Sequence, residues 1–398
     1  MKRMAFIATR EPSYSRVSIT RRELKKKYEL DEYLCQSSSY PLRMLWITIQ
    51  LLWSWVSGRL RKADVVFVGF LAQPIFPLVR LLYRGPIVAD AYFSLYDAMV
   101  NDKQKVSAGS LTGRICHWLD RQMLKRSELC FTDTQQHVQY MRQFFDVPNA
   151  NLKRLWISAE SEPLENNAAY QTGDRFEVFF WGGFIPLQGV DTIVRSAAIL
   201  KNENIHFTIF GSGQTFDACQ ELATELSGDN LNFAGWQLAD QIPRQAAKSH
   251  VALGIFGDTE KALRVIPNKS YEALAMGIPL ISCRSAAANE LLEEDKHCML
   301  VDAKDPVQLA EKIKWARDNY PQTLEMAHQG LQLFDSTCSP AKTAAIMYEA
   351  IDQLLRTHQT ASVDELLGDG NTLDNTNEKT INRTDQKANP DSIQPDLR

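Results

Sequence analysis

Residues Glu177–Leu200, EVFFWGGFIPLQGVDTIVRSAAIL, contain a strand, a glycine turn and a helix in direct succession. The run that ends at Trp181 has the length and apolar character of a buried strand, and Asp191–Leu200 has the length of a helix. Gly182 and Gly183 lie between them and allow positive φ and a close approach of backbone, and exposed N–H groups at such a turn attract phosphate oxygens. The alternative is a tight turn that needs glycine for steric reasons alone.

The same alternation is predicted along most of the chain. Buried strands alternating with helices indicate parallel sheets that are covered on both faces. The polar, turn-rich stretch Ser158–Asp174 interrupts the alternation and is the predicted linker. We therefore predict an α/β fold of two doubly wound, Rossmann-like domains, residues 1–165 and 166–340. The predicted strands are Met4–Ala8, Ala63–Phe70, Pro86–Ala91, Leu129–Phe131, Glu177–Trp181, His206–Phe210, Val251–Phe256 and Pro279–Cys283.

The last part of the chain is predicted to contain one helix and then a tail. Ala341–Arg356 has the composition of a good helix. From residue 357 to 398 the chain is rich in Asp, Asn, Thr, Gln and Lys and has few large apolar groups. Such a segment cannot bury enough apolar surface to offset its chain entropy, so we expect residues 357–398 to be disordered.

The net charge of -4 hides an asymmetry, because residues 1–165 carry +8 and the remainder -12. A basic half suggests an anionic partner, such as phospholipid headgroups, a lipid diphosphate or nucleic acid, although uneven decoration of two solvated surfaces would look the same. The seven cysteines have no C-x-x-C spacing and an odd total, which argues against disulfides and a zinc site. The apolar run of the N-terminus is too short for a signal peptide, so we expect a cytoplasmic protein.

The most informative stretch is GIFGDTEKALRVIPNKSYEALAMGIPLIS, Gly254–Ser282. Its polar loop contains Arg264, Asn268 and Lys269 and leads into a helix predicted to begin near Ser270. Two cations just before a helix N-terminus are unfavourable, because the helix dipole is positive there, and an anion such as a diphosphate would explain them. Glu272 can hydrogen-bond the two hydroxyl groups of a ribose, or it can simply stabilise the helix dipole.

These stretches together resemble the donor site of retaining family 4 (group 1) glycosyltransferases, which have the GT-B architecture of two facing Rossmann-like domains. PNKSYEALAMGIPLIS is similar to the sugar-nucleotide loop and helix of that family, WGGFIPLQGVDTIVRSA to its glycine turn, and AAANELL, Ala286–Leu292, to the segment that closes the site. GIFG followed by KALRVIPNK resembles a bacterial subgroup. The likeness covers Val178–Asp302, and it implies that the helix at 341–356 crosses back to the first domain. The implied donor-binding residues are Gly182, Gly183, Gly211, Pro267, Asn268, Ser270 and Glu272.

The resemblance also shows departures in the residues that bind the donor. Glu272 matches the second Glu of the family's E-x7-E pattern, but the first falls on Arg264. The turn that usually carries an Arg and a Lys has Gly183 and Gln188. We expect Arg264 and Lys269 to supply the missing positive charge and assign both a catalytic role. Because no D-x-D stands at a strand end, we expect transfer without a metal and without any cofactor other than the nucleotide-sugar co-substrate.

In the first domain the strand end DAYFSLYD, Asp90–Asp97, should face the other domain. Asp90 is the candidate to contact the acceptor or the transferred sugar, with capping of the next helix as its alternative. Tyr92 is a second candidate at this end. His137, in TDTQQH, could reach the same place, although a histidine early in a helix is more often solvated or packed.

The helix predicted for residues 42–62 is strongly apolar and contains Trp46, Trp53 and Trp55, with Arg59, Arg61 and Lys62 at its end. It is too short in pure apolar length to span a bilayer. It could lie on the inner face of an anionic plasma membrane, helped by the basic run at residues 21–27, or it could be a core helix on the sheet.

We therefore expect a glycosyltransferase that moves a sugar, with retention, from a nucleotide diphosphate to a glycan or lipid-linked acceptor in cell-surface polysaccharide or glycoconjugate synthesis. The alternative is a non-catalytic GT-B-like binding or assembly protein, which the departures at Arg264 and Gly183 favour. An oxidoreductase is excluded because no convincing G-x-G-x-x-G with a downstream acidic residue is present. Nucleic-acid binding has no motif in its favour.

Overall fold

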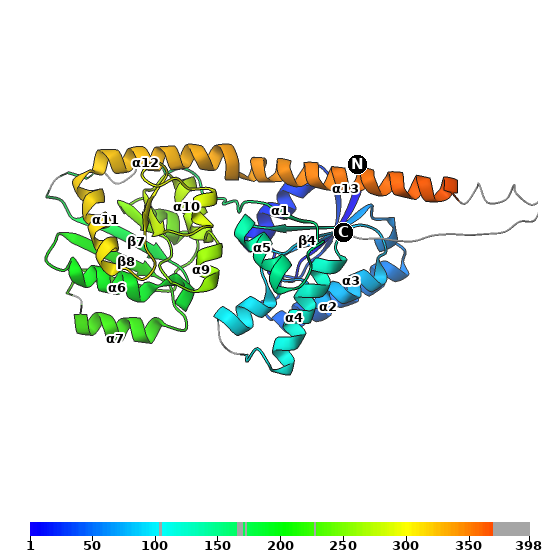
Figure 1. Ribbon diagram of the computed structural model, residues 1–398, viewed down its shortest axis with the longest axis horizontal. Helices are drawn as coiled ribbons and strands as arrows, with labels where there is room; N and C mark the ends of the chain where they lie inside the picture. The colour runs from blue at the N-terminus through cyan, green and yellow to red at the C-terminus, as the bar shows by residue number, and fades with distance from the viewer. Residues whose placement is uncertain (103–105, 165–169, 172, 227, 369–398) are drawn as a thin grey trace, which may run out of the picture. The chain divides into compact units, whose positions relative to one another are not determined.

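The computed structural model describes residues 1–102, 106–164, 170–171, 173–226 and 228–368. Met1–Leu355 forms one compact unit, and a second unit begins at Arg356. The predicted doubly wound fold is confirmed, because the compact unit contains two parallel sheets of six strands each, flanked by helices (Figure 1).

The first sheet has the strand order β2-β1-β3-β4-β5-β6, and all its pairings are parallel. Its strands are β1 (Arg3–Ile7), β2 (Glu29–Tyr33), β3 (Val65–Val68), β4 (Ile87–Asp90), β5 (Leu129–Thr132) and β6 (Leu152–Arg154). The helices are α1 (Ser15–Lys25), α2 (Tyr40–Val56), α3 (Phe76–Leu82), α4 (Leu111–Arg126) and α5 (Gln135–Phe144). Side chains of α2, α3, α4 and α5 form one core on the sheet, and α1 packs with α13 (Pro340–Gly368) in another core.

The second sheet has the order β12-β11-β10-β7-β8-β9, again parallel. Its strands are β7 (Phe176–Trp181), β8 (Ile205–Phe210), β9 (Leu231–Gly235), β10 (Val251–Leu253), β11 (Leu280–Cys283) and β12 (Met299–Val301). Its helices are α6 (Val190–Ile199), α7 (Phe216–Leu226), α8 (Gln241–Ala246), α9 (Glu260–Arg264), α10 (Asn268–Met276), α11 (Pro306–Asp318) and α12 (Tyr320–Leu333).

Helix α13 returns to the first domain. Its residues Met347, Ile351 and Leu355 are buried with Met4 and Phe6 of β1, on the face of the first sheet that α1 also covers (Figure 1). The helix begins at Pro340, one residue before the predicted start, and it continues to Gly368 rather than ending at Arg356. Residues 369–398 of the predicted tail and part of the predicted linker lie outside the described residues. The seven cysteines are free, and six of them are buried.

Helix α2 packs on the sheet, as its core alternative predicted, and it also carries an exposed apolar face. Arg43, Ile47, Leu51 and Ser54 are buried on the sheet side. A second set of apolar side chains is exposed along the helix at the spacing of one face. This exposed face consists of Leu42, Leu45, Trp46, Ile49, Leu52, Trp53 and Val56. In the described part of the chain, no helix combines the length and the apolar character that crossing a bilayer requires.

Candidate functional site

The glycine turn after β7 is held against the turn after β8. Gly182 has a φ of 152°, and a Cβ at Gly211 would lie 1.9 Å from the carbonyl oxygen of Gly182, so only glycine fits at position 211. Gly183 was also expected to allow positive φ, but its φ is not positive. A Cβ at Gly183 would meet no atom within 4 Å, which shows that this residue borders open space rather than packed backbone.

Lys269 in the first turn of α10 points at this glycine turn. Its Nζ donates a hydrogen bond to Gln188 Oε1, lies 3.5 Å from the centre of the Phe180 ring, and would be 2.7 Å from a Cβ at Gly182. The side chain is buried. Burial lowers the pKa of the Lys269 ammonium well below its usual value, and the carboxylate of Glu272 opposes part of this shift. An anion at the turn would therefore stabilise the charged form of this lysine.

Glu272 lies one turn further along α10. Trp181 Nε1 at the end of β7 donates a 2.7 Å hydrogen bond to Glu272 Oε2 and fixes the carboxylate. Burial raises the pKa of Glu272, while the hydrogen bond from Trp181 and the charge of Lys269 act to lower it. The helix begins at Asn268, two residues before the predicted start, and Pro267 is its N-cap residue. Ser270 is fully buried, and its Oγ has no hydrogen-bond partner in the described residues.

Arg264 does not contact the glycine turn in any described interaction and instead bonds to the first domain. Its Nη2 donates a 2.7 Å hydrogen bond to Asp97 Oδ2, and both side chains are buried. The guanidinium also stacks on Tyr140, 3.6 Å from the ring centre, and Tyr140 Oη donates to Asp97 Oδ1. Burial acts to raise the pKa of Asp97, but the charges of Arg264 and Lys261 and two hydrogen bonds lower it on balance. The charge of Arg264 is thus already compensated.

The loop that presents Asp97 is fixed by Asp120 of α4. Ser94 Oγ and the backbone N–H groups of Leu95 and Tyr96 donate hydrogen bonds of 2.8 to 3.1 Å to the Asp120 carboxylate. Burial raises the pKa of Asp120 to about 7, although these three hydrogen bonds act to lower it.

Three further contacts join the two domains near this ion pair. Thr134 Oγ1 donates a 2.6 Å hydrogen bond to the carbonyl of Arg264. The carboxylate of Glu290 accepts the backbone N–H groups of Gln135 and Gln136, at 2.7 and 2.8 Å. These are the first residues of α5, whose N–H groups have no acceptor inside the helix. Glu290 lies in the segment Ala286–Leu292, which was expected to close the site.

The third contact involves Tyr92. Its Oη donates a 2.8 Å hydrogen bond to Asn268 Oδ1 at the start of α10. Asp90, expected to contact acceptor or sugar, is buried and forms a two-point ion pair with Arg16 of α1, at 2.7 and 2.8 Å. The Arg16 guanidinium lies 4.5 Å from the centre of the Tyr92 ring. Asp90 therefore fixes Arg16, and Arg16 packs on Tyr92, which bonds to the second domain.

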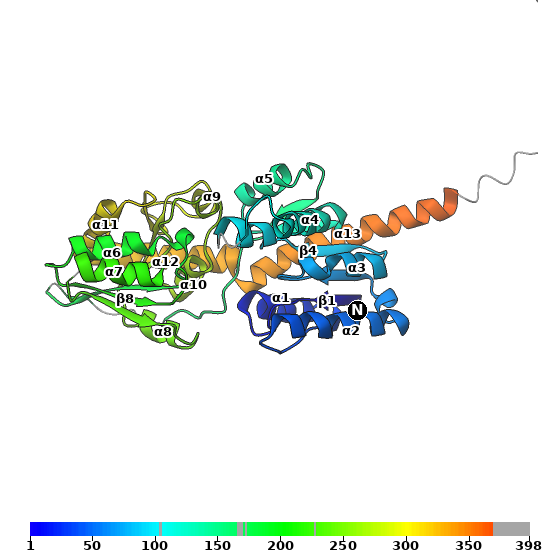
Figure 2. The same cartoon turned by 90° about the horizontal axis from the view of Figure 1, so that it is seen from below.

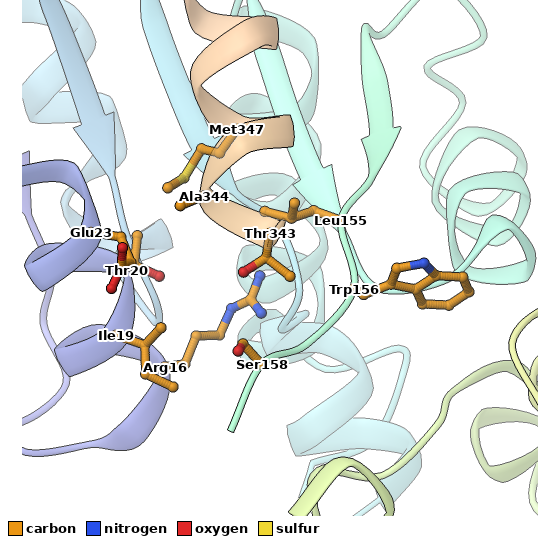
Figure 3. Close-up of a pocket in the computed structure, with 10 residues that line it drawn as sticks. All are labelled: Arg16, Ile19, Thr20, Glu23, Leu155, Trp156, Ser158, Thr343, Ala344 and Met347. Carbon is orange, nitrogen blue, oxygen red and sulfur yellow. The ribbon is translucent and has the colours of Figure 1, made fainter. Parts of the chain in front are cut away.

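Arg16 also borders a small pocket of about 30 Å³ between α1, the segment after β6 and the start of α13. Figure 3 shows its guanidinium extending from α1 toward Thr343 and Ser158. A volume of this size holds a water molecule or two and is too small for a sugar. We therefore place the candidate site at the glycine turn and α10 rather than here.

His137 is buried and packed, as its alternative interpretation had it. Its Nδ1 lies 2.6 Å from Asp133 Oδ1 and 3.0 Å from Thr132 Oγ1. The outer atoms of the pair, His137 Nε2 and Asp133 Oδ2, have no hydrogen-bond partner in the described residues. The spacing of four residues between Asp133 and His137 at a helix start could have predicted this pair.

The structure thus brings Lys269, Glu272 and the glycine turn together as predicted. It separates Arg264 and Asp90 from them by pairing each with an opposite charge. Sequence reasoning missed Asp97, Glu290 and Arg16, because their partners lie 74 to 167 positions away along the chain. Among the residues that the structure describes, no group of three or more His, Cys, Asp or Glu side chains could hold a metal ion.

Solved structures with the same arrangement define the class of the fold. The chain is similar to sucrose-phosphate synthase from Thermosynechococcus elongatus, with a TM-score of 0.70, 11% identity, and coverage of 90% of this chain and 100% of that one. It is also similar to HepE from Anabaena, solved in complex with UDP-glucose, with a TM-score of 0.65, 12% identity, and coverage of 89% and 100%. The predicted GT-B fold is confirmed by the similarity to these structures and by the two parallel sheets.

The resemblance to group 1 glycosyltransferases is confirmed for the second domain. Residues 175–319 match the family model described as "Glycosyl transferases group 1". The lipopolysaccharide core biosynthesis glycosyltransferase LpsD of Rhizobium meliloti (strain 1021) is 26% identical over 163 residues, which are 40% of this chain and 45% of that protein. The GDP-mannose-dependent alpha-(1-6)-phosphatidylinositol monomannoside mannosyltransferase of Mycobacterium tuberculosis (strain CDC 1551 / Oshkosh) is 25% identical over 153 residues, 36% and 39% of the two chains. The chain spans less than half the length of either relative.

Proposed function

We propose that this protein is a glycosyltransferase that moves a sugar, with retention of anomeric configuration, from a nucleotide diphosphate to a glycan or lipid-linked acceptor in cell-surface polysaccharide or glycoconjugate synthesis. The observation that carries the proposal is the convergence of Lys269 and Glu272 on the glycine turn, within the domain that matches the glycosyltransferase model. The Rhizobium relative, which by its description acts in lipopolysaccharide core synthesis, supports an acceptor of this class.

The donor would lie with its diphosphate over Gly183 and its ribose against Glu272. The open space at Gly183 admits phosphate oxygens close to the backbone, and Lys269 supplies the positive charge. A buried cation fixed beside the leaving diphosphate stabilises the charge that develops as the glycosidic bond breaks. A carboxylate already fixed by Trp181 can accept two ribose hydroxyl groups without further ordering. In this proposal transfer needs no metal, so EDTA should leave the rate unchanged.

The acceptor would bind on the first domain, beside Tyr92. Because Tyr92 also reaches Asn268, it lies where acceptor and donor would meet. Asp90 enters the proposal as a positioning residue, since both of its carboxylate oxygens are occupied by Arg16.

The proposal includes a peripheral contact with the inner face of an anionic membrane. The exposed apolar face of α2 supports it, because seven large apolar side chains on one helix face are exposed. A lipid-linked acceptor would then be presented to the first domain at the membrane surface.

Thermal-shift measurements with UDP, GDP, dTDP and CMP sugars test the donor site, since a bound ligand raises the melting temperature by mass action. Removing one charge-assisted contact costs about 2 kcal/mol, so Lys269→Gln should bind the stabilising nucleotide sugar about thirtyfold more weakly. Lys248→Gln is the matched control, because Lys248 is an exposed lysine of the same domain. If the Lys269→Gln variant and the wild type bind the nucleotide sugar with equal affinity, the proposed donor site is wrong.

A non-catalytic GT-B-like protein that uses this site for binding or assembly is the second candidate. The position of Arg264 favours this candidate, because Arg264 forms an ion pair with Asp97 and is therefore not available to bind a donor. Hydrolysis or transfer of the sugar nucleotide that binds separates the two. Binding without turnover, in the presence of membranes or glycan from the same cells, would favour the second candidate.

A further inference from the structure

A second pocket lies on the first domain at the end of α2. It has a volume of about 540 Å³, which is in the range of small-molecule sites. Its wall combines apolar side chains with two arginines and one carboxylate. The lining includes Trp55, Leu81, Tyr83, Arg61, Arg84 and Asp64.

This pocket is separate from the donor site. Asp64 directly precedes β3 and Pro86 directly precedes β4, so the pocket lies at the amino ends of these strands. Tyr92, which reaches α10, follows the carboxyl end of β4. The pocket therefore lies at the amino ends of the strands of the first sheet, whereas their carboxyl ends face the donor site.

The charges of the pocket favour an anion. Arg61 and Arg84 are exposed, and neither forms an ion pair with a carboxylate among the described residues. Arg61 lies 5.5 Å over the Trp55 ring and donates a hydrogen bond to its carbonyl, so its guanidinium is held at the wall. The one acidic lining residue, Asp64, accepts the backbone N–H of Arg3 at 2.7 Å. The pocket is lined by two guanidinium groups and one carboxylate, so its net charge is positive. A guanidinium group can donate two parallel hydrogen bonds to a phosphate.

The exposed apolar face of α2 leads to this pocket. Trp53 and Val56 are 72% and 66% exposed at the end of the helix, and α2 contains no charged residue except the buried Arg43. The cations Arg59, Arg61 and Lys62 follow the helix directly. Figure 2 shows α2 beside α3, whose last turn contributes Leu81 to the pocket. An apolar face that ends in a basic pocket matches the order of acyl chains and phosphate in a lipid monolayer.

We propose that this pocket binds the phosphate headgroup of an anionic phospholipid, with Arg61 and Arg84 as its ligands, while the exposed apolar face of α2 lies among the acyl chains. The inference rests on the proposed membrane contact and adds a headgroup site outside the donor site. The lipid serves here as an anchor and is chemically unchanged.

The test measures binding of the full chain to vesicles of phosphatidylcholine alone and of phosphatidylcholine with one third phosphatidylglycerol. Two cations at a membrane surface contribute enough that R61Q/R84Q should bind the anionic vesicles about thirtyfold more weakly. The matched control R59Q/K62Q removes the same charge from neighbouring residues outside the pocket. Binding of monomeric dihexanoyl phosphatidylglycerol separates the two variants, since only R61Q/R84Q should lose it.

Equal loss of the monomeric lipid in both double variants, or in neither, would overturn the headgroup site. Full competition by the same concentration of inorganic phosphate would overturn the lipid assignment. If the wild-type chain does not bind vesicles and elutes as a dimer in size-exclusion chromatography, the exposed apolar face contacts a second copy of the chain instead. Because no sugar nucleotide is present in these measurements, they remain informative if the protein proves to transfer no sugar.

Discussion

The substitution Asp97→Asn is expected to weaken the contact between the two domains without disturbing either core. Asparagine keeps the shape of the side chain and one oxygen to accept the hydrogen bonds of Tyr140 and Asn101. It replaces the carboxylate oxygen that faces Arg264 with an amide, so a buried guanidinium loses its counter-charge. The two domains should separate more often as a result.

The size of the effect follows from the burial of the pair. Removing one partner of a buried ion pair costs about 3 to 5 kcal/mol, because the other charge is left uncompensated. Arg264 keeps its stacking on Tyr140, a contribution of about 1 to 2 kcal/mol, so the lower figure of about 3 kcal/mol applies. At about 1.4 kcal/mol for each factor of ten, the separated state should become about a hundredfold more populated.

Backbone hydrogen exchange at Gln135 and Gln136 reports this separation. Their N–H groups bond to Glu290 of the second domain and have no acceptor within α5, so they exchange when the domains part. Both should exchange about a hundredfold faster in the Asp97→Asn variant. The N–H of Met141, in the middle of the same helix, should keep its rate.

Glu260→Gln is the matched control, since Glu260 also faces Arg264, at 3.9 Å, but its side chain is 95% exposed. An exposed pair contributes little, so this variant should change the exchange of Gln135 by less than about fivefold. Exchange at Gln135 and Gln136 that stays at the wild-type rate in Asp97→Asn would refute the claim that the buried ion pair holds the domains together.

Three other predictions concern buried groups whose pKa values are shifted, namely Glu272, Lys269 and Asp120. Glu272→Gln keeps an acceptor for Trp181 but not the charge, so the donor KM should rise about tenfold while the melting temperature stays level or increases. Because burial lowers the pKa of Lys269, donor binding at a pH between that lowered pKa and the usual 10.5 should take up a proton, which calorimetry in buffers of different ionisation enthalpy measures. Asp120, with a pKa of about 7 against 3.8 when unfolded, binds more protons when folded, so the free energy of unfolding should fall by up to about 4 kcal/mol between pH 4 and 7. Asp120→Asn should lack that part of the fall in urea titrations; an unchanged pH profile would contradict the assignment.

The fold could be predicted from the sequence wherever strands are buried on both faces. Such strands appear as continuous apolar runs, as in VFFW at 178–181, and need no knowledge of their neighbours. β2 was missed because it is an edge strand with the sequence ELDEY, which pairs only with β1 and is half-exposed. α1 was missed because its apolar residues Val17, Ile19 and Leu24 are few among many charges, and α13 supplies the surface that covers them.

The candidate site could be predicted only where its residues are close in sequence. Lys269 and Glu272 occupy one turn of α10, so a loop, a helix start and two charges suffice to predict them. The partners of Arg264 and Asp90 depend on which strand ends meet in space. An arginine that precedes a helix N-terminus predicts a bound anion near it. In the structure the group bound by Arg264 is the carboxylate of Asp97. Arg264 does bind an anionic group, as its position in the sequence predicted, but the sequence could not identify that group as Asp97.

The position of Arg264 is expected to couple the contact between the two domains to the proposed donor site. Only residues 265–267 separate α9, which bonds to Asp97, from α10, which carries Lys269 and Glu272. Asn268 at the start of α10 also bonds to Tyr92, so the segment that would hold the donor is fixed at two points by the first domain. If this segment is better ordered when the domains are joined, the donor binds the joined state more tightly. Coupling of this kind is reciprocal, so the donor must strengthen the domain contact by the factor that the contact gives to donor affinity. Asp97→Asn should therefore weaken donor binding from the opposite domain, and saturating donor should slow the exchange of Gln135 in the wild type.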